Sequence, residues 1–275
     1  MLKDMTLGQY FPGNSLLHKI DPRMKIIVSV IFIVAVFLAR NIYSFALLLS
    51  FTFILITISG IKATVILKGI KPIMLIVAFT AIINLFWTKG SVLLFSFGII
   101  NIYLEGVITA LFMVSRILVL MVGTSLLFSY TTSPIALTDG LEMLMKPLKK
   151  IKVPVHEFTM MMTIALRFIP TLIEETDKII NAQKARGADF ESGNILKRAK
   201  ALIPILIPLF ISAFRRADEL AVAMECRCYH GGDGRTKMKV LHMAFSDWIW
   251  LCVLLAFASG LVLLGFIPTI FTLSF

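Results

Sequence analysis

The sequence predicts an all-α, polytopic membrane protein with about five transmembrane helices and long cytoplasmic amphipathic helices. Of its residues, 58% are hydrophobic and only 16% are charged, whereas soluble domains carry about 25% charged residues. The mean hydropathy of +0.91 and several long stretches without charge are typical of a chain that crosses a bilayer repeatedly. This composition excludes a disordered chain and argues against a soluble enzyme.

The net charge of +11 comes from 27 Lys and Arg residues against 16 Asp and Glu residues. On so hydrophobic a background, this excess indicates anionic lipid and cytoplasmic loops rather than a nucleic-acid partner. The three cysteines do not form a disulfide framework, because Cys226 and Cys228 share one short stretch and Cys252 lies in an apolar run. We therefore expect reduced thiols in or near the cytoplasm.

Five apolar stretches are predicted to cross the membrane, since a crossing needs about 20 residues and tolerates about 17. The first, Ile26–Ala39, is the shortest, and we expect Arg23 and Lys25 to reach the headgroups with their long side chains. Gly90–Asn101 is apolar but too short for a helical crossing, which leaves a hairpin or a re-entrant piece. The other four stretches are Asn41–Ile61, Pro72–Thr88, Tyr103–Tyr130 and Trp248–Phe271.

The distribution of Lys and Arg sets the orientation, because short cytoplasmic loops carry an excess of these residues. With the N-terminus inside, only Arg40 and Lys89 fall in outside loops, and everything basic from Lys146 to Lys239 stays inside. Five crossings then place the C-terminus outside. The predicted divisions are a transmembrane region with an N-terminal cytoplasmic segment (1–130), a cytoplasmic coupling-helix domain (131–242) and a C-terminal transmembrane helix (243–275).

The segment 131–242 holds 17 of the 27 basic residues and 12 of the 16 acidic ones. Its apolar residues recur at spacings of three and four, which predicts amphipathic helices at the cytoplasmic face. We expect a short helix over Pro134–Lys146, a long helix over Pro154–Arg186 that Pro170 kinks, and a second long helix over Ile195–Tyr229 that two prolines interrupt.

The two long helices are predicted to end alike. In each, an Asp lies nine positions before an Arg, in the pairs Asp177 and Arg186, and Asp218 and Arg227. An Arg at an exposed helix end offers a rigid fork of donors to a carboxylate on another protein. Alternatively, each Arg only bonds the last carbonyls and the helix dipole, which is worth about 0.3–1 kcal/mol. The matched spacing favours the role in binding a partner.

Several short motifs occur in a specific order. Ala185-Arg186-Gly187 ends the first long helix, Cys226-Arg227-Cys228 ends the second, and Arg167-Phe168-Ile169-Pro170 lies within the first. Together with the N-terminal segment Ser15–Lys25, they resemble the transmembrane T component (EcfT/CbiQ-like) of energy-coupling factor (ECF) ABC transporters. The second motif departs from that family, because it has cysteines where Ala and Gly are expected.

The resemblance implies a non-catalytic subunit in the plasma membrane of a prokaryote, which links two ABC-type ATPase subunits to a membrane substrate-binding S component. Arg186 and Arg227 would dock into grooves on the two ATPases and pair with acidic residues there. The apolar face of the same helices would hold the S component, which carries a vitamin or other micronutrient and selects it. The residues expected to face the S component are Met161, Met162, Ala165, Ile169, Leu209, Ala213 and Leu220.

Sites for metal and nucleotide are not expected. Cys226 and Cys228 are two positions apart, so on a helix they face away from each other, and a fourth ligand beside His230 is not evident. The Gly-rich stretch 231–234 lacks the Lys-Ser/Thr pattern of a phosphate-binding loop. We therefore expect no metal, no cofactor and no ATP hydrolysis by the chain itself. His18 is expected to serve the helix start at Asp21 rather than catalysis.

The sequence leaves two alternative functions to consider. A stand-alone secondary transporter needs ionisable pairs within the membrane, for which only Arg116 and Glu105 are candidates. These two residues lie three turns apart on a similar helix face, and a charge such as Arg116 should face protein or water. A membrane-embedded enzyme needs His, Asp or Glu clustered at one depth, whereas the acidic residues lie mainly on the predicted cytoplasmic helices.

Overall fold

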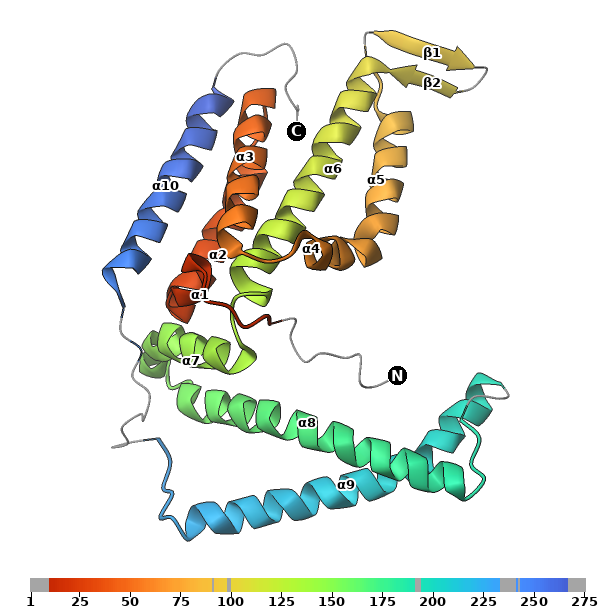
Figure 1. Cartoon of the computed structure of the whole chain (residues 1–275), viewed down its shortest axis with the longest axis vertical. Coiled ribbons are helices and arrows are strands. Elements are labelled where there is room, and N and C mark those ends of the chain that lie inside the picture. Colours follow the sequence, from red (N-terminus) through yellow and green to blue (C-terminus); the bar gives the residue numbers. More distant parts are fainter. Residues whose placement is uncertain are drawn as a thin grey trace. The chain divides into compact units, whose positions relative to one another are not determined.

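The computed structural model describes residues 10–90, 92–97, 100–190, 194–232, 241 and 243–266. Its regular elements are helices and one two-stranded hairpin, which confirms the all-α fold class (Figure 1). The described residues fall into two compact units. We call residues 10–140 with 241–266 the bundle, and residues 141–232 the long-helix unit.

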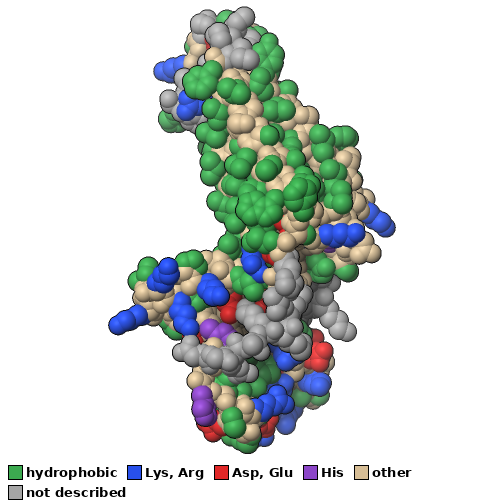
Figure 2. Space-filling view, turned by 90° about the vertical axis from the view of Figure 1, so that its left-hand side faces the viewer, with side chains coloured by type: hydrophobic (Ala, Val, Ile, Leu, Met, Phe, Trp, Pro, Cys, Tyr) green, Lys and Arg blue, Asp and Glu red, His purple; other side chains and the backbone are tan. Residues whose placement is uncertain are grey.

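Four segments of the bundle are long and apolar enough to cross a membrane, as judged by length and composition within the described residues. Two of them are single helices, α3 (Ile42–Ser59) and α10 (Phe245–Gly265). The third, Ala63–Trp87, comprises α4 (Ala63–Ile70), the 3₁₀ turn η2 (Lys71–Ile73) and α5 (Met74–Trp87). The fourth, Leu104–Ser129, comprises α6 (Leu104–Thr124) and the π-helical turn η3 (Ser125–Ser129). Hydrophobic side chains dominate the surface of the bundle in Figure 2.

The fifth predicted crossing, Ile26–Ala39, lies in α2 (Pro22–Leu38), which has 17 residues. At 1.5 Å per residue this helix is about 25 Å long, less than the roughly 30 Å of a hydrocarbon core. It packs against α6 and α10. The side chains of Phe32, Ala35 and Val36 are completely buried there, so α2 is the short, central helix of the bundle.

Close approaches hold the bundle together. Gly123 of α6 lies against the ring of Phe32, where an added Cβ would overlap the ring. Any larger residue at position 123 would therefore push α2 and α6 apart. The rings of Phe51 on α3 and Phe257 on α10 stack with their centroids 4.0 Å apart.

The start of α2 is fixed by carboxylates, as the predicted N-cap at Asp21 requires. The Asp21 side chain accepts a hydrogen bond of 2.9 Å from the backbone N–H of Arg23. The carboxylate of Asp247, in the first turn of α10, accepts bonds from the backbone N–H groups of Asp21 (3.1 Å) and Ala244 (2.8 Å). Asp247 thus joins the start of α2 to the start of α10.

Arg23 and Lys25, which were expected to reach the headgroups, make hydrogen bonds within the bundle. Nη2 of Arg23 donates to the carbonyl oxygen of Leu241 at 2.7 Å. Nζ of the buried Lys25 donates to the carbonyl oxygen of Thr131 at 2.7 Å. Backbone carbonyls within the bundle lie in reach of both side chains, and they replace the solvent that the charges would otherwise need.

His18, which was expected to serve the helix start at Asp21, makes its side-chain hydrogen bonds around α1. It lies in α1 (Leu16–Lys19), which precedes α2. Its Nδ1 is 2.6 Å from the hydroxyl of Ser15, and its Nε2 is 2.8 Å from the carbonyl oxygen of Phe11. The ring therefore ties the segment before α1 to this helix.

Arg116 and Glu105 do not form the ionisable pair that was considered. Their separation of eleven positions is about 16 Å along α6, too long for a direct ion pair. Nη2 of Arg116 donates to the carbonyl oxygen of Ala39 at 2.7 Å, and the guanidinium carbon lies 5.5 Å from the ring centroid of Phe45. Glu105 accepts a hydrogen bond of 3.3 Å from the backbone N–H of Val92.

The apolar stretch Gly90–Asn101 forms a hairpin, the first of its two predicted alternatives. Strands β1 (Leu93–Phe97) and β2 (Ile100–Tyr103) pair antiparallel, with Ser96 opposite Asn101. The stretch has too few residues for a helix of membrane length but enough for two short strands, which form a ladder with each other.

The long-helix unit follows α7 (Pro134–Met145), within which the two units divide. The 3₁₀ segment η4 (Lys146–Ile151) leads into α8 (Val155–Ala185), which confirms the helix predicted over Pro154–Arg186. Helix α9 (Ile195–Glu225) ends four residues earlier than predicted. Pro204 and Pro208 lie inside α9 without interrupting it, because each ring removes only one N–H donor from an otherwise continuous helix.

Helices α8 and α9 pack against each other. The carboxylate of Glu175 on α8 accepts a hydrogen bond from the hydroxyl of Ser212 and another, of 3.1 Å, from Nη2 of Arg216 on α9. This ionic contact is partly exposed to solvent. It fixes which side of α9 faces α8, because Ser212 and Arg216 are one helical turn apart.

Candidate functional site

The end of α8 is closed by its own backbone. The N–H of Ala188 donates to the carbonyl oxygen of Gln183, and the N–H of Gly187 donates to that of Lys184, both at 3.0 Å. Gly187 has a φ of 86°. These two bonds around one left-handed residue form the Schellman motif, for which glycine is the usual residue because it has no Cβ. Gly187 therefore caps the C-terminal end of α8.

The end of α9 has the same geometry. The N–H of Tyr229 donates to the carbonyl oxygen of Met224 at 3.1 Å, and that of Cys228 donates to Glu225 at 2.8 Å. Cys228 takes the left-handed conformation with a φ of 54°. The cysteine that replaces the expected glycine therefore does not abolish the tight helix ending.

Arg186 and Arg227 occupy equivalent positions, each directly before the left-handed residue of its motif. Both are exposed, as are the flanking residues Ala185, Gly187, Cys226 and Cys228. Within the described part of the chain, neither guanidinium has an ion-pair or hydrogen-bond partner.

The geometry weakens the alternative that these arginines serve only their own helices. The carbonyl oxygens of Gln183 and Lys184, and those of Met224 and Glu225, already accept backbone N–H donors. The guanidinium groups are thus available for an external carboxylate, with the five-donor fork that suits bidentate pairing.

The residues predicted to face the S component lie in two environments. On α8, Met161 and Ala165 are exposed, and Met162 and Ile169 are half-buried. On α9, three of them are half-buried and share the side of the helix that carries Ser212 and Arg216. These three residues are Leu209, Ala213 and Leu220.

The structure also presents an exposed apolar stripe on α9. Seven large side chains of this helix are each about half exposed or more: Leu202, Ile203, Leu206, Ile207, Phe210, Ile211 and Phe214. Their spacing of four was visible in the sequence. Since this part of α9 is apolar on nearly all sides, periodicity alone could not tell which side faces α8.

The cysteines near Arg227 remain thiols in this structure. Cys226, Cys228 and Cys252 are free and exposed. Among the described residues, no group of three or more His, Cys, Asp or Glu side chains is close enough to hold a metal ion.

The apolar bundle, with its candidate membrane crossings, and the paired long helices define a multi-pass membrane protein. Residues 13–238 match the family model CbiQ, described as cobalt transport protein. Three curated relatives are named energy-coupling factor transporter transmembrane protein EcfT. The chain therefore belongs to this family of transport proteins of the cell membrane, the transmembrane components of ECF transporters, as its motifs predicted.

The relatives match over nearly their whole length. The protein from Ruminiclostridium cellulolyticum is 54% identical over 267 residues, which cover 97% of this chain and 99% of the relative. The protein from Clostridium kluyveri is 56% identical over 250 residues, or 90% and 92% of the two chains. The protein from Bacillus subtilis is 46% identical over 264 residues, or 96% and 99%.

Proposed function

We propose that this chain couples two cytoplasmic ABC-type ATPases to a membrane-embedded S component, and so drives the uptake of a vitamin or other micronutrient. The observation that carries the proposal is the matched pair of helix ends, each of which presents an exposed arginine before a left-handed residue. Two equivalent contacts suit two equivalent ATPase subunits, and membership of the EcfT family supports the same assembly.

In this mechanism, Arg186 and Arg227 are the contact points with the ATPases. Each inserts into a groove and pairs with acidic residues there. Closing and opening of the ATPases moves the helix ends. Because α8 and α9 are continuous helices of 31 residues each, a displacement at one end is carried along a length of about 46 Å.

The apolar side of the long-helix unit would receive the S component. Met161 on α8 is exposed, and so is the apolar stripe of α9. Exposed apolar patches of this kind mark contacts with proteins or membrane. The S component would select the substrate, so this chain needs no substrate site of its own.

The double substitution Arg186→Glu with Arg227→Glu tests the proposal. In the chain co-expressed with its two ABC ATPases and its S component, it should abolish both ATPase co-purification and ATP-driven uptake. The reason is that reversed charge at each helix end repels the acidic residues of the grooves. Pull-down from purified membranes measures the first effect, and uptake of the labelled micronutrient measures the second.

The matched control is Arg198→Glu, an exposed arginine near the start of α9, which should leave both readouts near their original level. Western blotting of the membrane fraction verifies that each variant inserts. Normal co-purification and uptake by the double variant would refute the assigned role of the two arginines.

A further inference from the structure

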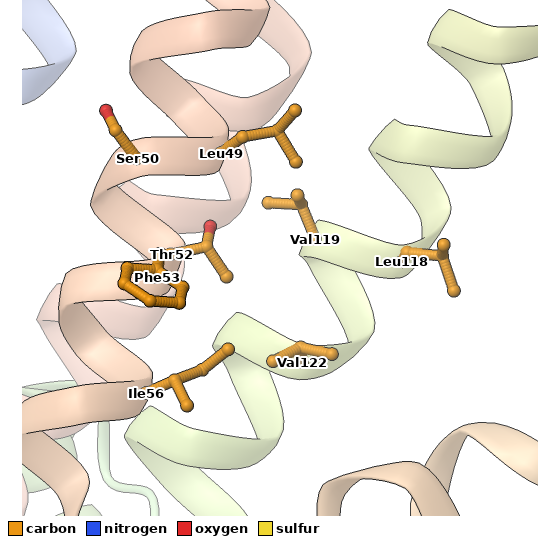
Figure 3. Close-up of a pocket in the computed structure, with 8 residues that line it drawn as sticks. All are labelled: Leu49, Ser50, Thr52, Phe53, Ile56, Leu118, Val119 and Val122. Atoms are coloured by element: carbon orange, nitrogen blue, oxygen red, sulfur yellow. The ribbon is translucent and has the colours of Figure 1, made fainter. Parts of the chain in front are cut away.

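An apolar groove lies between α3 and α6 of the bundle and has a volume of about 500 Å³. Figure 3 shows Leu49 of α3 and Val119 of α6 extending toward each other across it. Both helices belong to segments that can cross a membrane, so the groove is placed where hydrocarbon surrounds the protein. The lining residues are Leu49, Ser50, Thr52, Phe53, Ile56, Leu118, Val119 and Val122.

The two hydroxyl groups that line the groove are already engaged. The hydroxyl of Ser50 donates to the carbonyl oxygen of Leu47, and that of Thr52 donates to Leu48, both at 2.8 Å. These are bonds within α3. The groove therefore offers a ligand only van der Waals contact, which suits an aliphatic chain and disfavours any polar group that would lose its hydrogen bonds there.

One end of the groove leads to a basic helix. After α3 ends at Ser59, the chain turns into α4, which is anchored to the bundle by the buried side chain of Ile66. Lys62 before α4, Lys68 within it and Lys71 after it are all exposed. Helix α4 also contacts α6, the other wall of the groove.

The charges of these three lysines are not balanced by nearby sequence. No Asp or Glu occurs anywhere between Asp21 and Glu105, a segment that includes α2, α3, α4 and α5. Exposed lysines that follow an apolar helix attract anionic lipid headgroups.

We propose that the groove between α3 and α6 holds an acyl chain of an anionic phospholipid whose headgroup is bound by Lys62, Lys68 and Lys71. The two halves of the site match the two halves of such a lipid. The apolar walls contact the acyl chain, and the lysines bind the phosphate of the headgroup. A zwitterionic lipid would fill the groove equally well, but its headgroup would be attracted less strongly by the lysines. The site therefore selects lipids by the charge of the headgroup.

Native mass spectrometry of the full chain tests this site. The protein is extracted from vesicles of equimolar phosphatidylglycerol and phosphatidylcholine, and the lipid that stays bound is counted. We expect phosphatidylglycerol to be retained over phosphatidylcholine by about fivefold or more, as one or two effective lysine contacts provide. Equal retention of the two lipids would overturn the proposal.

The headgroup half is tested by the triple variant Lys62→Gln, Lys68→Gln and Lys71→Gln, which should bring the retention ratio close to one. The control removes the same number of charges from exposed positions at the start of α9, with Lys197→Gln, Arg198→Gln and Lys200→Gln. It should keep the preference. A preference that survives the first triple variant, or that disappears equally in the control, contradicts the role of the α4 lysines.

The groove half is tested by Leu49→Trp, which fills the space with a larger side chain at a half-exposed position. This variant should lose bound lipid of both kinds, whereas Leu263→Trp on the exposed side of α10 should not. Circular dichroism verifies that both variants keep their helix content. Unchanged lipid retention by Leu49→Trp would refute the site, as would crosslinking of Leu49→Cys to another subunit in the assembled complex, which would make the groove a helix-docking surface.

Discussion

At the scale of single residues, the two helix ends have the same hydrogen bonds but differ in the residue that takes the left-handed conformation. Gly187 takes it without steric cost, and nothing lies within 4 Å of an added Cβ there. Cys228 takes it with a Cβ, which costs roughly 1–2 kcal/mol for an L-residue. The end of α9 is thus held in the same shape as the end of α8 at lower stability.

Replacing Cys228 by glycine should therefore stabilise the end of α9. Part of the relief is offset by the greater freedom of glycine in the unfolded chain, so we expect a net gain of about 0.5–1 kcal/mol. Amide hydrogen exchange of the purified chain measures it, since the N–H groups of Cys228 and Tyr229 close the motif. Their exchange should slow by a factor of about two to five.

A matched control lies two residues away. Cys226 has a φ of −60°, which any residue adopts in a helix, so Cys226→Gly should speed exchange at the same amides by loosening the last turn. If the two glycine variants changed exchange in the same direction, the left-handed conformation of Cys228 would not be the source of the strain.

The residue scale also shows where sequence reasoning succeeds. The N-cap at Asp21 and the cap at Gly187 were predictable because each depends on a few neighbouring residues. The partners of Arg23, Lys25 and Arg116 were not, because their carbonyl acceptors at Leu241, Thr131 and Ala39 are distant in sequence. No local sequence pattern predicts which backbone carbonyl will lie near a long side chain once the bundle has folded.

At the scale of elements, α8 and α9 are held together by an ionic contact that their periodicity did not reveal. Glu175 accepts from both Ser212 and Arg216, and its side chain is 25% exposed. A partly exposed pair of this kind contributes about 1 kcal/mol or less, to which the bond from the hydroxyl adds a similar amount.

The substitution Glu175→Gln should loosen the pairing of the two helices by about 1 kcal/mol, or about fivefold in the population of separated helices. Pulsed electron paramagnetic resonance between spin labels at the exposed positions Ala182 and Val222 should show a broader distance distribution. The three native cysteines are replaced by serine for this experiment, so that only the two introduced sites carry labels.

Glu174→Gln provides the control, because Glu174 is adjacent in sequence but exposed. It should leave the distance distribution as it was. Equal broadening by both variants would indicate a general effect of lost charge on α8 rather than a specific contact of Glu175.

Among the elements, α7 and α8 lie within one residue of their predicted bounds, because Pro and Gly residues mark their ends. The hairpin extends to Tyr103, two residues beyond the stretch predicted for it. The end of α9 was placed four residues too late, because a cysteine in the left-handed conformation gives no stop signal in the sequence. Which apolar side of α9 is exposed was not predictable, for a different reason. The side that faces α8 is chosen by Glu175, a residue of another helix.

At the scale of the whole molecule, the bundle and the long-helix unit divide the chain by chemistry. The first is apolar on its surface, and the second carries most of the charge (Figure 2). Hydropathy and charge spacing record such a difference in chemistry, because both depend only on composition along the chain. The short length of α2 was also visible in the sequence, where Ile26–Ala39 is the shortest of the five apolar stretches.

A whole-molecule prediction concerns catalysis. The purified chain alone should show no ATP hydrolysis above background, because it lacks the phosphate-binding loop pattern that ATPases use. A phosphate-release assay measures this, with the chain assembled with the proposed ABC ATPases as the positive control. Clear turnover by the isolated chain, unchanged by Arg186→Glu with Arg227→Glu, would overturn its assignment as a coupling subunit.

The bundle is discontinuous in sequence, since its last helix, α10, is added after the whole long-helix unit. That unit is therefore an insertion with two tethers, one through α7 and one through the segment before α10. The second tether leads into α10, where the carboxylate of Asp247 accepts a hydrogen bond from the backbone N–H of Asp21 at the start of α2. A domain attached at one terminus swings about a single pivot, whereas an insertion loads both of its attachment points at once. If the long helices move as proposed, the displacement therefore acts on α7 and α10 at the same time.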